Sequence, residues 1–320
     1  MSGADTPKTE VNCRSREKMS STKKTFDGAF TVDVEDYFHV SAFASRIQPD
    51  DWDQYECRVE QNTHRVLDVA ARAGTTGTFF VLGWVAERYP GLIREIQTAG
   101  HEIGCHSMWH QLVYDLGPDR FRHDLIDARN VLEDVTGTPI VLYRSPSFSV
   151  TRRSQWALSI LREEGFQTDS SIYPVRHDRY GIPGAPLQPH LIHTSAGSVR
   201  EFPGMVCEVA GMRIPVGGGG YLRLFPWTLT RNLLHRVRRQ GRPLNVYIHP
   251  WELDPEQPRI AASLKSRFRH YQNLNTTAGK TERLLREFSL STMSSVLDTW
   301  SFAEDCDSPP GIRPGTWTVM

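Results

Sequence analysis

Two histidines four positions apart are the residues of this sequence best suited to bind a metal ion. They are His106 and His110, in the segment His-Ser-Met-Trp-His. If this segment forms one turn of helix, both imidazoles lie on one face, within reach of a single ion. The alternative is a pair of surface histidines at the start of a helix. Two imidazoles leave a hydrolytic zinc-type site incomplete, so a third ligand is required, commonly a carboxylate.

An acidic cluster offers that carboxylate. Asp33, Glu35 and Asp36 follow the apolar run 29–32. Because side chains alternate along a strand, we expect Asp33 and Glu35 on the same side, where one binds metal and the other acts as general base. A solvated turn is the alternative, but a strand of buried type precedes the cluster and two aromatic residues follow it.

Five polar or ionisable residues come directly after predicted strands. In chain order they are Asp33, His106, Arg144, Asp169 and His249. In parallel β/α proteins the carboxyl ends of the strands form the edge where catalytic groups meet. One aspartate after a strand is ordinary turn chemistry. Five such residues at one edge predict a functional site there.

The elements that position these residues alternate between short β-rich runs and helical segments that end in glycine. This alternation is typical of βα units and a largely parallel sheet. The predicted strands are 29–32, 76–82, 101–105, 140–143, 166–168 and 244–248. The predicted helices are 60–73, a segment from Pro90 to before Gly100, 118–136, a segment capped by Thr151 and ending before Gly165, 226–240 and 281–288.

The remaining segments define the domain organisation. Residues 174–220 contain short stretches interrupted by glycine and proline, which indicates an irregular or antiparallel insertion. The polar residues 1–25 predict a disordered tail, and the Pro/Gly-rich end from Ser308 is expected to be mobile. We therefore expect one domain over 26–290, between an N-terminal tail and a C-terminal tail over 291–320.

Composition excludes several classes of protein. The chain has 320 residues with 37 Lys+Arg and 37 Asp+Glu, so bulk charge offers no attraction for nucleic acid. The most apolar stretch, 73–86, is too short to span a bilayer, and the N-terminal residues lack the apolar region of a secretory signal, so we expect a cytoplasmic protein. Five widely spaced cysteines without a Cys-x-x-Cys pair argue against a disulfide framework or a thiolate zinc site.

The ordered motifs resemble those of the NodB-homology polysaccharide deacetylases of carbohydrate esterase family 4. They look most like the branch associated with exopolysaccharide loci and the exosortase system, and the resemblance covers about 26–290. It implies Asp33 as general base and either Glu35 or Asp36 as the metal carboxylate. The complete His-Ser-Met-Trp-His motif implies its two histidines as metal ligands.

Three later motifs extend the resemblance. The family arginine that orients the catalytic aspartate is matched by Arg144, in a motif where Ser147 replaces the usual tyrosine. That position contributes mainly a backbone N–H to the oxyanion. The fourth motif begins at Asp169, without the tryptophan often found nearby. The fifth motif implies His249 as general acid, with Asp169 as the partner that raises its pKa.

The resemblance and the pattern together imply a distorted (β/α) barrel with fewer than eight strands and the insertion described above. The implied activity is metal-dependent removal of N-acetyl groups from an exopolysaccharide or its lipid-linked precursor, with release of acetate. Zn²⁺ is the expected metal, although Co²⁺ or Ni²⁺ suits the same ligands. The implied partners are the N-acetylated glycan and membrane-associated polymer-synthesis machinery, with the protein peripheral at the inner membrane.

Two other functions remain open at this point. The same fold can hydrolyse a non-sugar amide or an O-acetyl ester, because the chemistry is shared. A carbohydrate-binding or scaffold subunit without turnover is suggested by Ser147 and the missing tryptophan, but such a protein has no need for acid, base and ligands together. The basic run Arg236–Arg239 indicates a solvated helix face more than a contact with anionic membrane.

Overall fold

The computed structural model describes residues 25–177, 179–302 and 317–318. The predicted N-terminal tail and the Pro/Gly-rich end from Ser308 lie almost entirely outside these residues.

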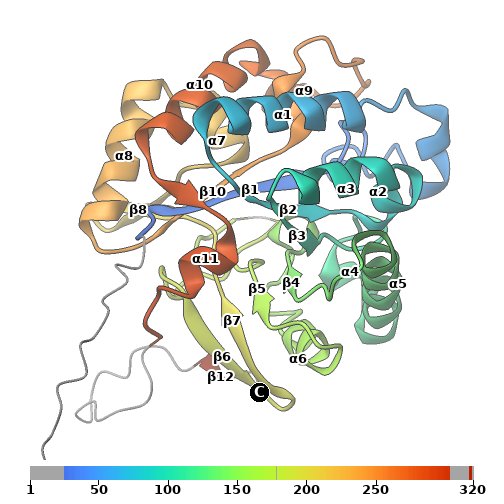
Figure 1. Cartoon of the computed structure of the whole chain (residues 1–320), viewed down its shortest axis with the longest axis horizontal. Helices are drawn as coiled ribbons and strands as arrows, with labels where there is room; N and C mark the ends of the chain where they lie inside the picture. Colours follow the sequence, from blue (N-terminus) through green and yellow to red (C-terminus); the bar gives the residue numbers. More distant parts are fainter. Residues whose placement is uncertain (1–24, 178, 303–316, 319–320) are drawn as a thin grey trace, which may run out of the picture.

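A curved, mostly parallel sheet forms the centre of the domain (Figure 1). Its strands are β1 (Gly28–Val34), β2 (Thr78–Val81), β3 (Glu102–Cys105), β4 (Leu142–Tyr143), β5 (Thr168–Asp169), β6 (His190–Thr194), β7 (Gly197–Glu201), β10 (Leu244–Ile248), β11 (Leu290–Ser291) and β12 (Trp317–Thr318). The order is β10-β1-β2-β3-β4-β5-β7-β6-β12, and β11 also pairs with β1. The strands from β10 to β7 are parallel. The sheet curls into a half-barrel, which confirms the predicted distorted (β/α) barrel.

Helices cover the outside of this half-barrel (Figure 1). They are α1 (Val59–Ala73), α2 (Gly83–Arg88), α3 (Pro90–Thr98), α4 (Val113–Leu116), α5 (Pro118–Thr136), α6 (Trp156–Glu163), α7 (Gly219–Leu224), α8 (Trp227–Arg239), α9 (Leu264–Tyr271), α10 (Leu274–Glu287) and α11 (Met293–Leu297). Short 3-10 helices occur at η1 (Pro49–Gln54), η2 (Pro146–Phe148) and η3 (Pro250–Leu253). Within the described residues, no helix is both long and apolar enough to cross a bilayer.

Local signals placed several helix ends correctly. Helix α5 begins with Pro118 in its first turn and is followed by Gly137 at φ 66°, a left-handed conformation that glycine adopts without strain. The predicted cap of α6 is wrong, because α6 begins at Trp156 and the Thr151 N–H instead donates to Ser154 Oγ. Helix α10 begins at Leu274, earlier than predicted, because contacts with α1 and η3 stabilise a polar first half that has little apolar periodicity.

The insertion at residues 174–220, expected to be irregular or antiparallel, contains antiparallel strand pairs. Strands β6 and β7 pair antiparallel, and β7 joins the main sheet beside β5. Strands β8 (Val206–Val209) and β9 (Met212–Pro215) form a second antiparallel hairpin. Packing also continues past residue 290, since Met293, Val296 and Leu297 are buried with residues of β1 and β2.

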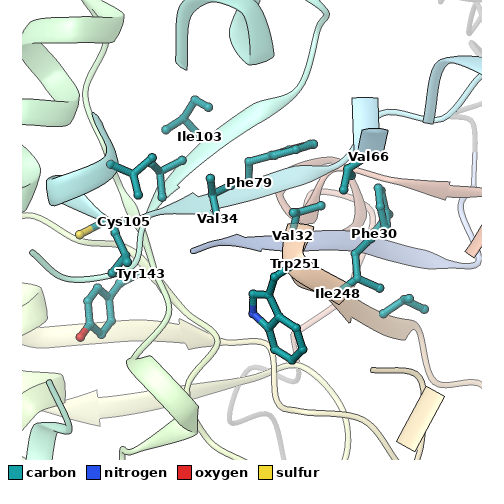
Figure 2. Close-up of a cluster of buried hydrophobic side chains, with 14 of the residues drawn as sticks. Phe30, Val32, Val34, Val66, Phe79, Ile103, Cys105, Tyr143, Ile248 and Trp251 are labelled. Carbon is teal, nitrogen blue, oxygen red and sulfur yellow. The ribbon is translucent and has the colours of Figure 1, made fainter. Parts of the chain in front are cut away.

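The two faces of β1 separate the core from the site. Phe30, Val32 and Val34 are fully buried in the cluster that the outer helices cover, together with Val66 of α1 (Figure 2). The alternate residues face the interior of the half-barrel, where the Thr31 hydroxyl donates to the carbonyl of Val246 on β10. The strand is buried on both faces, as parallel strands usually are, and its carboxyl end is held rigidly.

Candidate active site

A cavity of about 480 Å³ opens at the carboxyl ends of β1, β3 and β10. Five of the predicted site residues line it: Asp33, Glu35, His106, His110 and His249. Of the five residues predicted at strand ends, Asp33, His106 and His249 line this cavity. Arg144 lies fully buried beneath the cavity, whereas Asp36 and Asp169 face other parts of the protein.

Glu35, His106 and His110 form the only group of potential metal ligands found in the described part of the chain. One ligand atom from each lies within 4.8 Å of the others, and all three residues are buried. His110 Nε2 is 2.6 Å from Glu35 Oε2, yet the two are not aligned as a hydrogen bond, and Oε2 has no other partner among the described residues. Two imidazoles and an unsatisfied buried carboxylate fit a divalent ion such as Zn²⁺.

The orientation of His106 suits a metal ligand. Its Nδ1 lies 2.8 Å from the carbonyl oxygen of Arg144. Because a carbonyl only accepts, Nδ1 carries the proton and Nε2 keeps its lone pair. Burial lowers the pKa of His106 to about 4, so the ring is neutral at pH 7.

The segment between the two histidines is a loop, so the prediction of a helical turn is wrong. Ser107 and His110 have φ of 71° and 50°, which interrupts any helix. Asp124 of α5 accepts hydrogen bonds from the N–H groups of Met108 (3.0 Å) and Trp109 (3.1 Å). This carboxylate brings the imidazoles together where helix geometry does not. Sequence reasoning missed Asp124, although its place on the apolar face of α5 was a signal.

Arg144 holds the predicted base in place. Its Nη1 donates to Asp33 Oδ1 at 2.8 Å and to Thr31 Oγ1 at 2.7 Å. Its Nη2 donates to Ser170 Oγ (3.0 Å) and Asn245 Oδ1 (3.3 Å). A buried guanidinium with partners on four sides is rigid, so it fixes one oxygen of Asp33 and leaves the other toward the cavity. The polar Asn245 in an otherwise apolar strand was an unused signal for this network.

His249 faces both carboxylates of the site. Its Nε2 is 3.8 Å from Asp33 Oδ2 and 3.6 Å from Glu35 Oε1. Its Nδ1 is 3.5 Å from Glu252 Oε2, and Glu252 Oε1 accepts from Arg223 Nε at 3.0 Å. Burial opposes protonation of the ring, but Glu252 first and then the other two carboxylates outweigh it and raise the pKa of His249 to about 9.

Asp169 is not the partner of His249, so that prediction is wrong. Asp169 and Glu201 are opposite each other on the paired strands β5 and β7, and both are fully buried. Asp169 Oδ1 accepts from the hydroxyl of Ser171. Burial raises the pKa of Asp169 to about 6 and that of Glu201 well above its usual range. The strand register turns Asp169 toward β7, and Glu252 stands beside His249 instead.

The two candidate metal carboxylates lie in different surroundings. Glu35 is grouped with the histidines. Asp36 Oδ2 accepts from the N–H groups of Arg58 (2.6 Å) and Val59 (2.8 Å), and Oδ1 accepts from Tyr37 N–H. The bonds from Arg58 and Val59 satisfy donors at the start of α1, which is the role of a helix-capping carboxylate.

Comparison with protein-family models matches most of the chain to two models. Residues 50–167 match the model described as polysaccharide deacetylase, and residues 170–298 match a domain of unknown function, DUF3473. Over residues 50–167 the chain is therefore similar to the polysaccharide deacetylase family. The second match supports the resemblance to the exopolysaccharide-associated branch of this family.

Two curated relatives each match about a third of the chain. A peptidoglycan-N-acetylglucosamine deacetylase of Bacillus cereus is 28% identical over 106 residues, which are 33% of this chain and 48% of the relative. The peptidoglycan-N-acetylmuramic acid deacetylase PdaA of Bacillus subtilis is 33% identical over 106 residues, 33% of this chain and 40% of the relative. The chain spans less than half the length of either relative.

One solved structure shares the fold over nearly the full length. The crystal structure of a candidate polysaccharide deacetylase from Mycobacterium smegmatis superposes with a TM-score of 0.59 at 21% sequence identity. The match covers 96% of this chain and 99% of that chain.

A tryptophan from a different segment lies in the candidate site. Trp251 lines the cavity, stacks on His249 with ring centroids 5.1 Å apart, and donates from Nε1 to Glu35 Oε1 at 3.1 Å. No tryptophan occurs at residues 170–176, directly after Asp169, and the tryptophan of this site comes from η3. Ser147, at the position where the family has tyrosine, lines the same cavity with φ 52°.

Proposed function

We propose that this protein is a metal-dependent hydrolase that removes N-acetyl groups from a polysaccharide. One observation carries the proposal: a single cavity contains two imidazoles and a carboxylate fit for a metal, a second carboxylate, and an imidazole whose pKa is raised. These groups supply every role that hydrolysis of an amide requires.

Glu35, His106 and His110 would hold the ion. When bound, a divalent ion polarises an acyl carbonyl and lowers the pKa of water. Trp251 donates to Glu35 Oε1 and so fixes the plane of the carboxylate, while the Arg144 carbonyl fixes the His106 ring. Such outer contacts orient the ligands before the metal arrives.

Asp33 is placed to accept the proton of the attacking water. Arg144 binds Oδ1, so Oδ2 is the oxygen directed at the cavity, 3.8 Å from His249 Nε2. The guanidinium also compensates the negative charge of this buried carboxylate.

His249 is placed to protonate the departing amine. An amine leaves poorly as an anion, so the reaction needs an acid near the nitrogen. With a pKa of about 9, the His249 imidazole carries a proton at neutral pH, and Glu252 keeps it there. The ring lies on the same cavity as Asp33, which allows base and acid to act on one substrate.

The substrate class is an N-acetylated glycan of an exopolysaccharide or its lipid-linked precursor. The relatives described as peptidoglycan deacetylases act on N-acetyl sugars, and the match to the exopolysaccharide-associated branch supports a polymer outside that class. Aromatic side chains such as Trp251 and Tyr247 line the cavity, and flat rings of this kind suit the apolar faces of sugars.

Acetate release from N-acetylglucosamine oligomers and from an N-acetylated exopolysaccharide tests the proposal. Chelator-stripped protein should be inactive, and added Zn²⁺ or Co²⁺ should restore release. Asp33→Asn should reduce the rate by about 10²–10⁴, the usual contribution of a general base, with the metal still bound. Asp68→Asn, at an exposed position on α1, is the matched control and should keep full activity. Tight metal binding without acetate release from any glycan would contradict the proposal.

A further inference from the structure

Exposed apolar and basic side chains gather beside the mouth of the cavity. On α9, Leu264 is 83% and Phe268 is 62% exposed, and Leu224 at the end of α7 is 45% exposed. Leu224 and Phe268 line the cavity. Figure 1 shows α9 at the periphery of the molecule, just before α10 along the chain. We call the following residues the α9 patch: Leu224, Leu264, Lys265, Arg267, Phe268 and Arg269.

The apolar side chains of the patch project together. Leu264 and Phe268 are four residues apart on one helix, so they share a face. Single exposed apolar residues are normal on soluble proteins, whereas grouped ones mark interaction sites. Three of the six exposed large apolar residues of the described chain belong to this patch: the six are Trp109, Met212, Leu224, Leu229, Leu264 and Phe268.

The charges of the patch are all positive. Helix α9 carries Lys265, Arg267 and Arg269 and no acidic residue. None of the three forms an ion pair with another described residue, and Arg179 adds a further cation to the cavity lining. The carboxylates that line the cavity are buried at its base, beside the histidines. The rim is therefore complementary to an anionic surface.

We propose that the α9 patch docks on an anionic lipid surface. Leu264 and Phe268 enter the headgroup region, and the flanking lysine and arginines pair with lipid phosphates, as interfacial helices do. Since α9 has eight residues, the attachment is weak and reversible. Because the cavity opens beside the patch, docking turns the cavity toward the membrane. If the deacetylase function holds, the acetylated sugar is then one that is carried at a membrane surface.

On the basic helix α8, three of the four arginines already have partners. On α8, Arg238 lies 2.6 Å from Asp27 and Arg231 lies 2.5 Å from Glu287. Arg236 donates to the carbonyl of Glu208. These contacts support the solvated helix face that the sequence favoured for this run, and they make α8 a suitable control surface.

Sedimentation of the full chain with vesicles tests the docking surface without any substrate. We expect binding to vesicles of equal parts phosphatidylglycerol and phosphatidylcholine, weakened by salt, and little binding to pure phosphatidylcholine. The double variant Leu264→Asp/Arg267→Glu should lower the partition at least tenfold. Neither side chain lines the cavity, and both are exposed, so thermal unfolding should be unchanged.

A matched variant on the other surface separates specific docking from general charge. Met212→Asp/Arg239→Glu changes a methionine as exposed as Phe268 and an exposed arginine, and it should bind vesicles like the parent. Equal loss in both variants, or no binding of the parent to anionic vesicles, would overturn the proposal. A dimer in light scattering that Leu264→Asp dissociates would assign the patch to a second copy of the chain. These outcomes do not depend on acetate release, so they are distinguishable from failure of the deacetylase function.

Discussion

Two buried histidines of the site have opposite protonation behaviour. Burial lowers the pKa of His106 to about 4, because the nearby carboxylates of Asp33 and Glu35 offset only part of the cost of charging the ring. The same burial acts on His249, yet the neighbouring Glu252 raises the pKa of that ring to about 9. Such separation of pKa values by environment is how one site obtains both a neutral ligand and a charged acid.

Glu252→Gln should move the alkaline limb of the pH profile. Because its pKa is raised to about 9, His249 is protonated at lower pH, and it loses this proton as the pH rises through that value. Removing the Glu252 charge lowers the pKa of His249. The pH above which activity falls should therefore decrease by roughly one unit or more. The pH dependence of kcat for acetate release measures this. Glu256→Gln, exposed and close in sequence, should leave the profile in place, and an unshifted limb in Glu252→Gln would assign the acid elsewhere.

At the scale of single elements, one side chain of helix α5 holds the loop that carries His106 and His110. Asp124, within α5, accepts hydrogen bonds from two N–H groups of the loop between His106 and His110. An asparagine there keeps one acceptor oxygen and loses the second. Asp124→Asn should therefore weaken metal binding by about 10–100-fold, as loss of outer-shell contacts does. Competition with a chromophoric chelator measures the affinity. Asp127→Asn, exposed on the same helix, is the control, and equal affinities for the two variants would contradict the role of Asp124.

The adjacent residues Glu35 and Asp36 have different roles, because Asp36 binds N–H groups at the start of α1 whereas Glu35 is grouped with the histidines. Asp36→Ala removes the acceptor of three backbone N–H groups, and should cost about 0.5–2 kcal/mol of unfolding free energy in urea denaturation. Its metal affinity should stay within a few-fold of the parent. Glu35→Gln should lose metal binding, because it removes the one carboxylate grouped with the histidines. If Asp36→Ala lost as much metal affinity as Glu35→Gln, the assignment of the two acids would be wrong.

At the scale of the whole molecule, the packed unit extends beyond the domain end expected at residue 290. Helix α11 places Met293 fully buried against the half-barrel, and its N–H donates to Thr78 Oγ1 at 2.7 Å. Met293→Ala should cost about 2–5 kcal/mol of unfolding free energy, the range for large-to-small changes in a core. Leu229→Ala, at an exposed position, should change it by less than about 0.5 kcal/mol. A cost for Met293→Ala no larger than for Leu229→Ala would show that this segment adds nothing to the fold.

The sequence by itself determined the features that depend on local pattern. Pro118 and Gly137 marked the ends of α5, and the apolar strand 244–248 was read residue for residue, because caps and strand runs are set by neighbours in the chain. Because the carboxyl ends of parallel strands meet at one edge of a sheet, the sequence also predicted that Asp33 and His249 lie at the same edge.

Only the tertiary structure decided which groups are partners. Glu252 instead of Asp169 stands beside His249, and Glu35 instead of Asp36 joins the histidines. Asp124 holds a loop from another element. Each of these depends on the direction in which a side chain leaves its strand or helix, and that direction follows from strand register and packing between segments distant in sequence. Residue type and spacing carry no information about it, so the chemistry of the site was readable from the chain and the pairing of its charges was not.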